Sequence, residues 1–330
     1  MGSAVPRGKT VDVVYTWVDD RWPGYRDQLA QYSEKAADLD PGRTRDNLDL
    51  MRYSLRGLEK TFPMLGTVYL LTCRPQVPAW LDRSNPRLRI VHHDEIMSDG
   101  ILPTFNSLAI ITHLHLLPGI SDQFLYVEDD MLIRPALKLT DLETGDGRPR
   151  IYPWKYWTPQ LSEIVDPMQE SAWNLALAMS DHLVNQHYGT SGRRRQICHA
   201  PLLIDRAAWQ SVMEEFADSI SHTRASRFRS AGNVDPASLY LWSRLAQGRA
   251  VLEDRKTGRR ISQYVPLEDF WPVTLLALLR SRTGLAGWVN LNDNFGPRPS
   301  RVTEWLVRRQ LQAWYPEPSS FERRDSTARS

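Results

Sequence analysis

One stretch of the sequence constrains the fold more than any other. The apolar run 124–127 leads directly into three consecutive carboxylates, Glu128, Asp129 and Asp130, and apolar sequence resumes at 131–133. The uninterrupted β-forming residues predict a buried strand. Adjacent carboxylates repel one another, so their place at the end of such a strand is unfavourable unless a cation binds there. Ligands of open α/β sheets bind beyond the carboxyl ends of the strands. The run therefore predicts a divalent-metal site for a phosphorylated ligand; the alternative is a solvated acidic turn.

The composition is that of an ordinary globular protein, and it narrows the classes of partner. The chain has 330 residues and a formal net charge of +2, which provides no overall attraction to nucleic acid or to a membrane. Cys73 and Cys198 are too far apart for a disulfide framework or a metal motif. No apolar run is long enough to cross a membrane, and no secretory signal is visible. We expect a cytoplasmic protein, with peripheral attachment to the inner face of the membrane as an alternative; the oligomeric state cannot be inferred.

The first part of the chain alternates strand patterns with helix patterns. No Gly-x-Gly-x-x-Gly follows the first strand, so the dinucleotide-binding fingerprint is absent. In the second helix Leu48, Met51, Leu55 and Leu58 recur at helical spacing and predict a core-facing side. The predicted strands span residues 11–18, 67–72, 88–93 and 124–127, and the predicted helices span residues 25–37, 45–60 and 105–117. This order predicts an α/β fold with a Rossmann-like, doubly wound sheet and helices on both faces.

Two stretches in the second half of the chain leave alternatives open. The aromatic run 152–157 contains Pro153, which favours an irregular segment over a clean strand, and it could line a carbohydrate site or cover the core. Residues 188–195 combine two glycines with three successive arginines. That segment suits a mobile lid, a binding surface for a polyanion or an exposed loop. Helices are predicted for residues 171–182 and 235–246.

A second group of chemically competent residues lies after residue 198. His199 precedes Pro201 and a short apolar strand, where its imidazole could act as a base near neutral pH or as a nucleophile. The segment 223–230 carries Arg227 and Arg229, whose guanidinium groups suit phosphate. Residues 287–294 again form a short apolar strand that ends in polar oxygens.

Several segments together resemble the Stealth family. This family includes bacterial capsular polysaccharide phosphotransferases and the catalytic subunit of the lysosomal-enzyme N-acetylglucosamine-1-phosphotransferase. The segments are residues 11–19 (VDVVYTWVD), 45–60 (RDNLDLMRYSLRGLEK), 89–117 (with IVHHDEI and LPTFNS), 126–130, 199–201, 227–230 and 291–294. The resemblance implies transfer of a sugar-1-phosphate from a UDP-sugar to a glycan hydroxyl. We expect UDP-N-acetylglucosamine as donor, a phosphodiester product, release of UMP and a role in capsule or exopolysaccharide synthesis.

The resemblance also implies a domain organisation. We expect a disordered N-terminus over residues 1–10, one Stealth-type catalytic domain over residues 11–316 and a C-terminal tail over residues 317–330. Within the domain, residues 11–140 would form the nucleotide-binding half and residues 141–316 the acceptor and catalytic half. The sheet would be similar to that of GT-A glycosyltransferases, with aromatic-rich insertions.

The family motifs carry residue roles onto this chain. His199, Arg229 and Asp130 are implied as catalytic residues, and Asp130, Asp293 and Asp129 as ligands of Mg²⁺ or Mn²⁺. The family usually has Asn where this chain has Glu128, which leaves the role of that residue open. His199 would be the general base or a covalent nucleophile, and we prefer the base.

Other residues are predicted to bind the donor or the acceptor. They are Asp19, Trp17, Arg45, Asp46, Asn106, Arg227 and Asn292. Simpler roles compete at several of them: Asp46 and Asn106 could cap helices, and Arg45 could be a solvated surface residue. Two other functions remain as alternatives, a metal-dependent glycosyltransferase that releases UDP and a non-catalytic carbohydrate-binding module.

Overall fold

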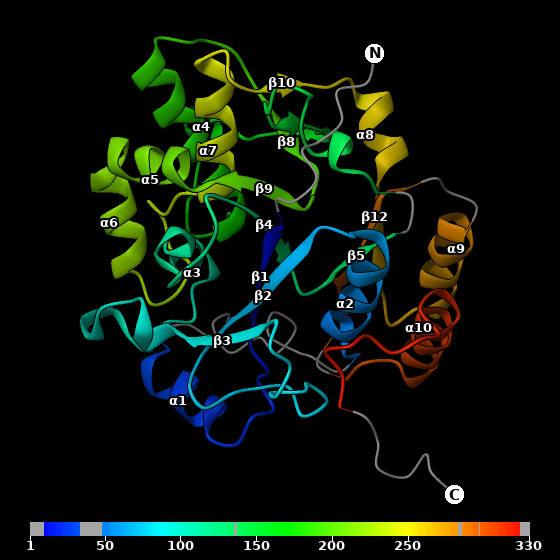
Figure 1. The fold of residues 1–330 in the computed structure, drawn as a ribbon. Helices are drawn as coiled ribbons and strands as arrows, with labels where there is room; N and C mark the ends of the chain where they lie inside the picture. Colours follow the sequence, from blue (N-terminus) through cyan, green and yellow to red (C-terminus); the bar gives the residue numbers. More distant parts are fainter. Residues whose placement is uncertain (1–9, 34–47, 135–136, 283–285, 297, 324–330) are drawn as a thin grey trace, which may run out of the picture. The chain divides into compact units, whose positions relative to one another are not determined.

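The computed structural model describes residues 10–33, 48–134, 137–282, 286–296 and 298–323 (Figure 1). These residues form two compact units, each assembled from separate stretches of the chain. Unit 1 contains residues 93–125 and 139–259. Unit 2 contains the described residues of the ranges 4–92, 126–138 and 260–330. No helix in the described residues is long and apolar enough to cross a membrane.

The largest sheet has five strands in the order β3-β2-β1-β4-β9. Both β1–β2 and β2–β3 pair in parallel, which requires crossover connections. Val13, Val14 and Tyr15 of β1 are fully buried, as expected for a central strand. The strands span Val11–Trp17 (β1), Leu65–Thr72 (β2), Leu88–His92 (β3), Gln123–Glu128 (β4) and Leu202–Asp205 (β9). The strand order confirms the α/β class.

A smaller sheet in unit 2 has the order β11-β12-β5. β11 (Ser262–Leu267) runs parallel to β12 (Trp288–Asp293), which runs antiparallel to β5 (Met131–Ile133). Its apolar residues share one core with three helices, α2 (Leu50–Thr61), α9 (Trp271–Arg282) and α10 (Arg301–Trp314). The described part of the chain therefore contains both parallel and antiparallel strand pairs, within the predicted α/β class.

The predicted core side of α2 is confirmed, because Leu48, Met51, Leu55 and Leu58 are all buried. The helix begins at Leu50, several residues later than expected, and Asp49 occupies the N-cap position with φ of 53°. Arg45 and Asp46, which were predicted to start this helix, lie outside the described residues.

Unit 1 is mainly helical. Its two longest helices, α4 (Ala172–Tyr188) and α7 (Pro236–Ala246), pack on one another and begin at the side-chain caps Ser171 and Asp235. The remaining α-helices of the described residues are α1 (Tyr25–Tyr32), α3 (Ser107–Ile111), α5 (Arg206–Glu215), α6 (Ala217–Ala225) and α8 (Arg255–Ile261). The remaining strands are β6 (Arg150–Ile151), β7 (Pro153–Trp157), β8 (Arg195–Ile197) and β10 (Val251–Leu252).

The helix predicted for residues 105–117 is interrupted. It forms α3, and a separate 3₁₀ turn follows over residues 114–116. Thr112 Oγ1 donates to the Ala109 carbonyl at 2.7 Å, and His113 Nδ1 lies 2.8 Å from the same oxygen. These side chains compete with the backbone for that acceptor, which explains why the α-helix stops.

Two other expectations are corrected, and one alternative is decided. The aromatic run forms β7 despite its proline, because Pro153 occupies the first position of the strand, where it is tolerated. β7 pairs antiparallel with β8, which includes only the last residue of the arginine-rich segment, Arg195; residues 189–194 connect α4 to β8 without regular structure, as the loop alternative predicted. The predicted tail contains a packed segment: Phe321 is fully buried, and Glu322 accepts hydrogen bonds from Arg52 and Arg56.

Candidate functional site

The three consecutive carboxylates lie on a tight connection between two buried strands. Glu128 is the last residue of β4, Asp129 and Asp130 form the turn, and β5 begins at Met131. The Asp130 carbonyl accepts a hydrogen bond from Leu291 N at 3.1 Å, so β12 fixes the backbone of the turn. The apolar sequence on both sides of the acids is therefore core, as predicted, and it leaves the carboxylates at a strand end.

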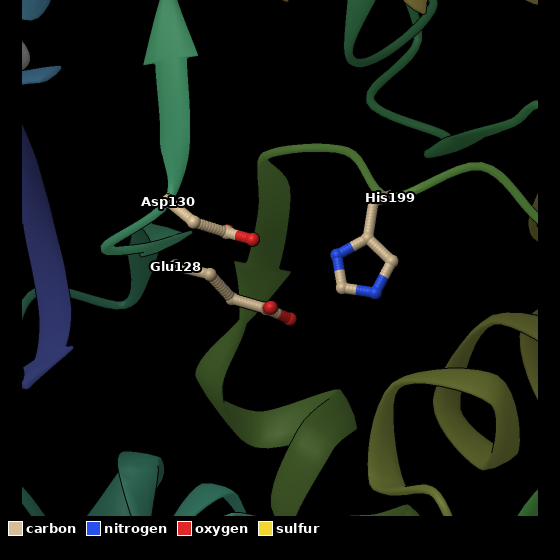
Figure 2. Close-up of side chains that lie close together, drawn as sticks. All are labelled: Glu128, Asp130 and His199. Carbon is tan, nitrogen blue, oxygen red and sulfur yellow. The ribbon is translucent and has the colours of Figure 1, made fainter. Parts of the chain in front are cut away.

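The structure groups two of these carboxylates with an imidazole. Glu128, Asp130 and His199 each offer one ligand atom, and these atoms lie within 4.8 Å of one another. Figure 2 shows the three side chains directed toward a common space. Two carboxylate oxygens suit Mg²⁺ or Mn²⁺, and the imidazole nitrogen suits a transition metal better than Mg²⁺. The donor set therefore fits a divalent cation.

The same carboxylates affect a buried neighbour on β4. Burial, together with the charges of Glu128, Asp129 and Asp130, raises the pKa of Tyr126 well above its usual range. The Tyr126 hydroxyl shares a hydrogen bond with Thr16 Oγ1 at 3.1 Å, so it is held in its neutral form inside the sheet. The negative potential at this strand end is what a bound cation would offset.

Asp293 ends β12, the strand beside Asp130. Its Oδ1 accepts a hydrogen bond from Phe295 N at 2.9 Å, which folds the chain into a turn after the strand. Asn290 pairs with Met131, and the next residue, Leu291, is the neighbour of Asp130. Asp293 therefore lies two residues, or about 7 Å of strand, beyond the neighbour of Asp130. Among the described residues, the grouped ligand atoms do not include Asp129 or Asp293. The assignment of Asp129 and Asp293 as metal ligands stays a prediction. Glu128, whose role the sequence left open, is instead a member of the group.

In unit 1, His199 and Arg229 both lie close to the indole ring of Trp173. The ring centroids of His199 and Trp173 are 6.0 Å apart, and the Arg229 guanidinium carbon lies 5.7 Å from the Trp173 ring centroid. Arg229 Nη2 also donates to Ser107 Oγ at 2.5 Å. Trp173 was not among the predicted site residues. Its place in the first turn of α4 could not be related to His199 from sequence, because 26 positions separate them.

Asn106 holds the loop that carries the two predicted phosphate-binding arginines. Its side chain accepts from Leu108 N as the cap of α3 and donates to Ser226 O at 3.0 Å and to Asn233 Oδ1 at 2.9 Å. The side chain is fully buried, so the capping alternative is confirmed and any effect on a substrate would pass through this loop. Arg227 within the loop donates to Pro103 O at 2.8 Å.

The other predicted substrate-binding residues lie at two strand ends. Trp17 closes β1 and is buried, with 4% of its surface exposed. Asp19 follows β1; its N–H donates to Gln76 Oε1 at 2.7 Å, and its carboxylate pairs with Arg21. Asn292 on β12 donates to Asn294 Oδ1 at 2.6 Å. The structure thus assigns protein contacts to these residues and does not test their contact with substrate.

The chain matches two conserved regions of one protein family. Residues 43–151 match Stealth protein CR2, conserved region 2, and residues 198–242 match Stealth protein CR3, conserved region 3. The first match contains the acidic turn at 128–130, and the second contains His199 and Arg229.

Curated relatives match along almost the whole chain. The exopolysaccharide phosphotransferase SCO6023 of Streptomyces coelicolor is 34% identical over 97% of this chain and 53% of its own length. The chain thus spans about half the length of that relative. The receptor polysaccharide phosphotransferase WefC of Streptococcus oralis is 26% identical over 94% of this chain and 99% of its own length. Among solved structures, the galactosyltransferase LgtC aligns over 94% of this chain and 98% of its own, with 12% identity and a TM-score of 0.40. The chain belongs to the Stealth family.

Proposed function

We propose that this protein is a polysaccharide phosphotransferase, which transfers a sugar-1-phosphate to a glycan hydroxyl and forms a phosphodiester. The observation that carries the proposal is the group of Glu128, Asp130 and His199, whose ligand atoms lie within 4.8 Å of one another. Two supports are independent of it: the match to two Stealth regions, and the phosphotransferase names of relatives that align over nearly the whole chain.

The donor we propose is a UDP-sugar, with UDP-N-acetylglucosamine as the first candidate. In the reaction the acceptor hydroxyl oxygen forms a bond to the β-phosphorus, the bond between that phosphorus and the bridging oxygen breaks, and UMP leaves. A Mg²⁺ or Mn²⁺ ion held by Glu128 and Asp130 would neutralise charge on the diphosphate. Arg229 would contact the transferred phosphate through its guanidinium group, which suits phosphate oxygens.

His199 has two chemically distinct roles open to it. As a base, its imidazole accepts the proton of the acceptor hydroxyl; as a nucleophile, it forms a phosphohistidine before the second transfer. A nitrogen whose lone pair binds a cation cannot accept a proton at the same time. Because a neutral imidazole has only one unprotonated nitrogen, metal binding and base catalysis would require different stages of the reaction. We favour the base.

The nucleotide product tests the proposed reaction. The protein is incubated with UDP-N-acetylglucosamine and a panel of other UDP-sugars, with Mg²⁺ or Mn²⁺ and a hydroxyl-bearing glycan acceptor, and the nucleotides are separated by anion exchange. We expect UMP together with a phosphodiester signal in the ³¹P spectrum of the product. Release of UDP would instead identify a glycosyltransferase. Glycan binding that persists in Asp130→Ala and His199→Ala, with no turnover in the parent protein, would identify a binding module.

A trapping experiment separates the two roles of His199. The protein is mixed with donor labelled in the β-phosphate, without acceptor, and is then denatured at alkaline pH. We expect no protein-bound label, as a base requires. Acid-labile label that is present in the parent and absent from His199→Ala would establish the nucleophilic role.

A further inference from the structure

The outer surfaces of α9 and α10 in unit 2 are unusually apolar. Of the fourteen large apolar side chains that are exposed in the described part of the chain, seven belong to these two helices and the residue before α9. Between 43% and 69% of the surface of each is exposed. They are Phe270, Trp271, Val273, Leu276, Leu279, Val302 and Trp305, and we call this set the α9–α10 face. Single exposed apolar residues need no explanation, but a group of this size on adjacent elements indicates an interaction surface.

The seven residues form one surface because the two helices share one core. Leu278 of α9 and Val307 and Leu311 of α10 are buried in the same cluster on the β11-β12-β5 sheet. The helices also pack against each other, as the orange and red helices of Figure 1 show. Their sides away from the core are therefore adjacent.

α9 is apolar on both of its sides, which a solvated surface helix normally is not. Thr274 and Leu278 face inward and are buried, whereas Val273, Leu276 and Leu279 are exposed on the opposite side. The helix has 12 residues, so it is about 18 Å long, whereas the hydrocarbon core of a bilayer is about 30 Å thick. A helix of this length can lie on a membrane but cannot cross it.

The charges around the face identify the kind of partner. The ionisable side chains of the two helices whose surroundings the structure describes are Arg280, Arg301, Arg308 and Arg309, with Glu304 as the one acid. The Arg309 guanidinium carbon lies 5.5 Å from the Trp305 ring centroid. Tryptophan, phenylalanine and leucine side chains bordered by arginines match the boundary between lipid headgroups and acyl chains, because arginine can extend to anionic headgroups while its stem stays apolar.

Two acidic residues lie just before α9, but backbone and side-chain donors of unit 2 engage them. Asp269 accepts hydrogen bonds from Gly296 N and Ser300 N, both at 2.9 Å. Glu268 accepts one from Asn294 Nδ2 at 3.0 Å. These contacts reduce the repulsion that the two carboxylates would exert on an anionic surface.

We propose that the α9–α10 face binds the surface of a membrane that contains anionic lipid. The apolar side chains enter the boundary between headgroups and acyl chains, and the arginines contact lipid phosphates. A formal net charge of +2 does not locate such a surface, and attachment to a membrane was predicted only as an alternative, with no residues assigned.

Vesicle co-sedimentation tests the proposal. The parent protein is mixed with vesicles of phosphatidylcholine and phosphatidylglycerol at a 7:3 ratio and, separately, with phosphatidylcholine alone. We expect binding to the anionic vesicles, at least about tenfold weaker binding to the neutral ones, and weakening by salt. The double variant Leu276→Glu and Leu279→Glu should bind the anionic vesicles at least about tenfold less. Arg301→Gln combined with Arg309→Gln should lower the affinity for the anionic vesicles and remove most of the salt dependence of binding.

Matched controls keep the result specific. The double variant Val165→Glu and Met168→Glu places the same two charges on exposed residues of unit 1, and it should bind vesicles like the parent. All the substituted positions are exposed, so melting temperatures should stay close to that of the parent, which excludes unfolding as the cause. The assay needs no turnover, and its outcome is therefore independent of the proposed transferase activity.

Two results would overturn the proposal. One is vesicle binding that is absent from the parent or unchanged in the Leu276→Glu and Leu279→Glu variant. The other is a concentration-dependent dimer, without vesicle binding, that the same variant abolishes; it would show that a second copy of the chain covers this face.

Discussion

The acidic turn in unit 2 and the arginine loop in unit 1 hold charged groups in opposite ways. The turn at 128–130 joins two buried strands, and packing of apolar residues on both sides fixes its backbone. The loop at 226–233 has no strand behind it, and the buried amide of Asn106 holds it through hydrogen bonds. In unit 2, therefore, a carboxylate of the turn can be substituted without changing the apolar packing that fixes the backbone. In unit 1, substituting the buried side chain of Asn106 affects both the stability of the fold and the position of the arginines.

The contrast is sharpest at Asp130, where we expect the largest effect. Asp130→Asn keeps the size of the side chain and should lower kcat for sugar-phosphate transfer about 1,000-fold, which corresponds to about 4 kcal/mol of transition-state stabilisation. The melting temperature should change by no more than a few degrees, because β5 and β12 hold the backbone. Steady-state kinetics and thermal unfolding check the two parts.

Glu128→Gln and Asp129→Asn are the matched variants for Asp130→Asn. Glu128 belongs to the grouped ligand atoms, so its substitution should raise the concentration of Mn²⁺ needed for half-maximal activity. A larger loss in Asp129→Asn than in Glu128→Gln would contradict the grouping and favour the ligand set that the family resemblance implied.

The support of the acidic turn can be altered alone through Gly57 on α2. A Cβ at this position would collide with the Ile133 carbonyl oxygen and lie 2.7 Å from Tyr315 Cε1. Gly57→Ala should therefore destabilise the protein by about 3 kcal/mol or more, because β5 and α2 cannot approach as closely. Urea unfolding measures the loss. Gly145→Ala is the control, since a Cβ there meets nothing within 4 Å and should leave stability nearly unchanged.

Asn106→Ala should instead reduce stability and activity together. The substitution leaves the Leu108 N–H and the Ser226 carbonyl without their partner, which costs about 2–3 kcal/mol, and it releases the loop that positions Arg229. We expect a lower melting temperature and a higher KM for the donor. Asn174→Ala removes a partly buried contact to Glu170 and should change neither by much. A stable Asn106→Ala protein with normal KM would refute the role assigned to the polar support.

The difference between apolar packing and polar contacts also explains which features could be predicted from the sequence. Strands β4 and β12 and the core side of α2 were recognised because a buried strand or helix face has a periodic apolar pattern that depends only on neighbouring residues. Glu128 to Asp130 were located for the same reason, since a carboxylate run inside apolar sequence is visible locally. The α/β class followed from these elements.

Contacts made by polar side chains across long sequence separations were not predictable. Nothing in the sequence relates Trp173 to His199, or Asn106 to Ser226 and Asn233, because such pairs have no period. Packing of the C-terminal segment was missed for the same reason: Glu322 looks like part of a polar tail until Arg52 and Arg56 are placed beside it. β7 was missed because the general effect of proline on strands was applied to a position at the strand start.

The smallest effect we expect is a difference in the acid sensitivity of the two units. Burial, with a further contribution from Arg224, lowers the pKa of His113 in unit 1 from 6.5 to about 4. In unit 2, burial raises the pKa of Glu322, but hydrogen bonds from Arg56, Ser319 and Arg52 outweigh it, so the pKa is lowered overall. The two groups therefore lose their contributions to stability in different pH ranges.

A histidine with a lowered pKa stabilises the fold fully above pH 6.5, and this contribution is lost as pH falls toward 4, because the unfolded chain binds the proton more tightly. The loss of the Glu322 contribution begins only near pH 4.5 and continues below it. Between pH 6.5 and 5, unit 1 should lose on the order of 2 kcal/mol while unit 2 changes little. Hydrogen exchange of the two units across this range measures the difference. His113→Gln should reduce the dependence of the stability of unit 1 on pH. The part that remains is due to His115, because burial and Arg224 also lower the pKa of that histidine to about 4. Equal acid sensitivity of both units would show that their buried polar groups do not differ in the way the structure indicates.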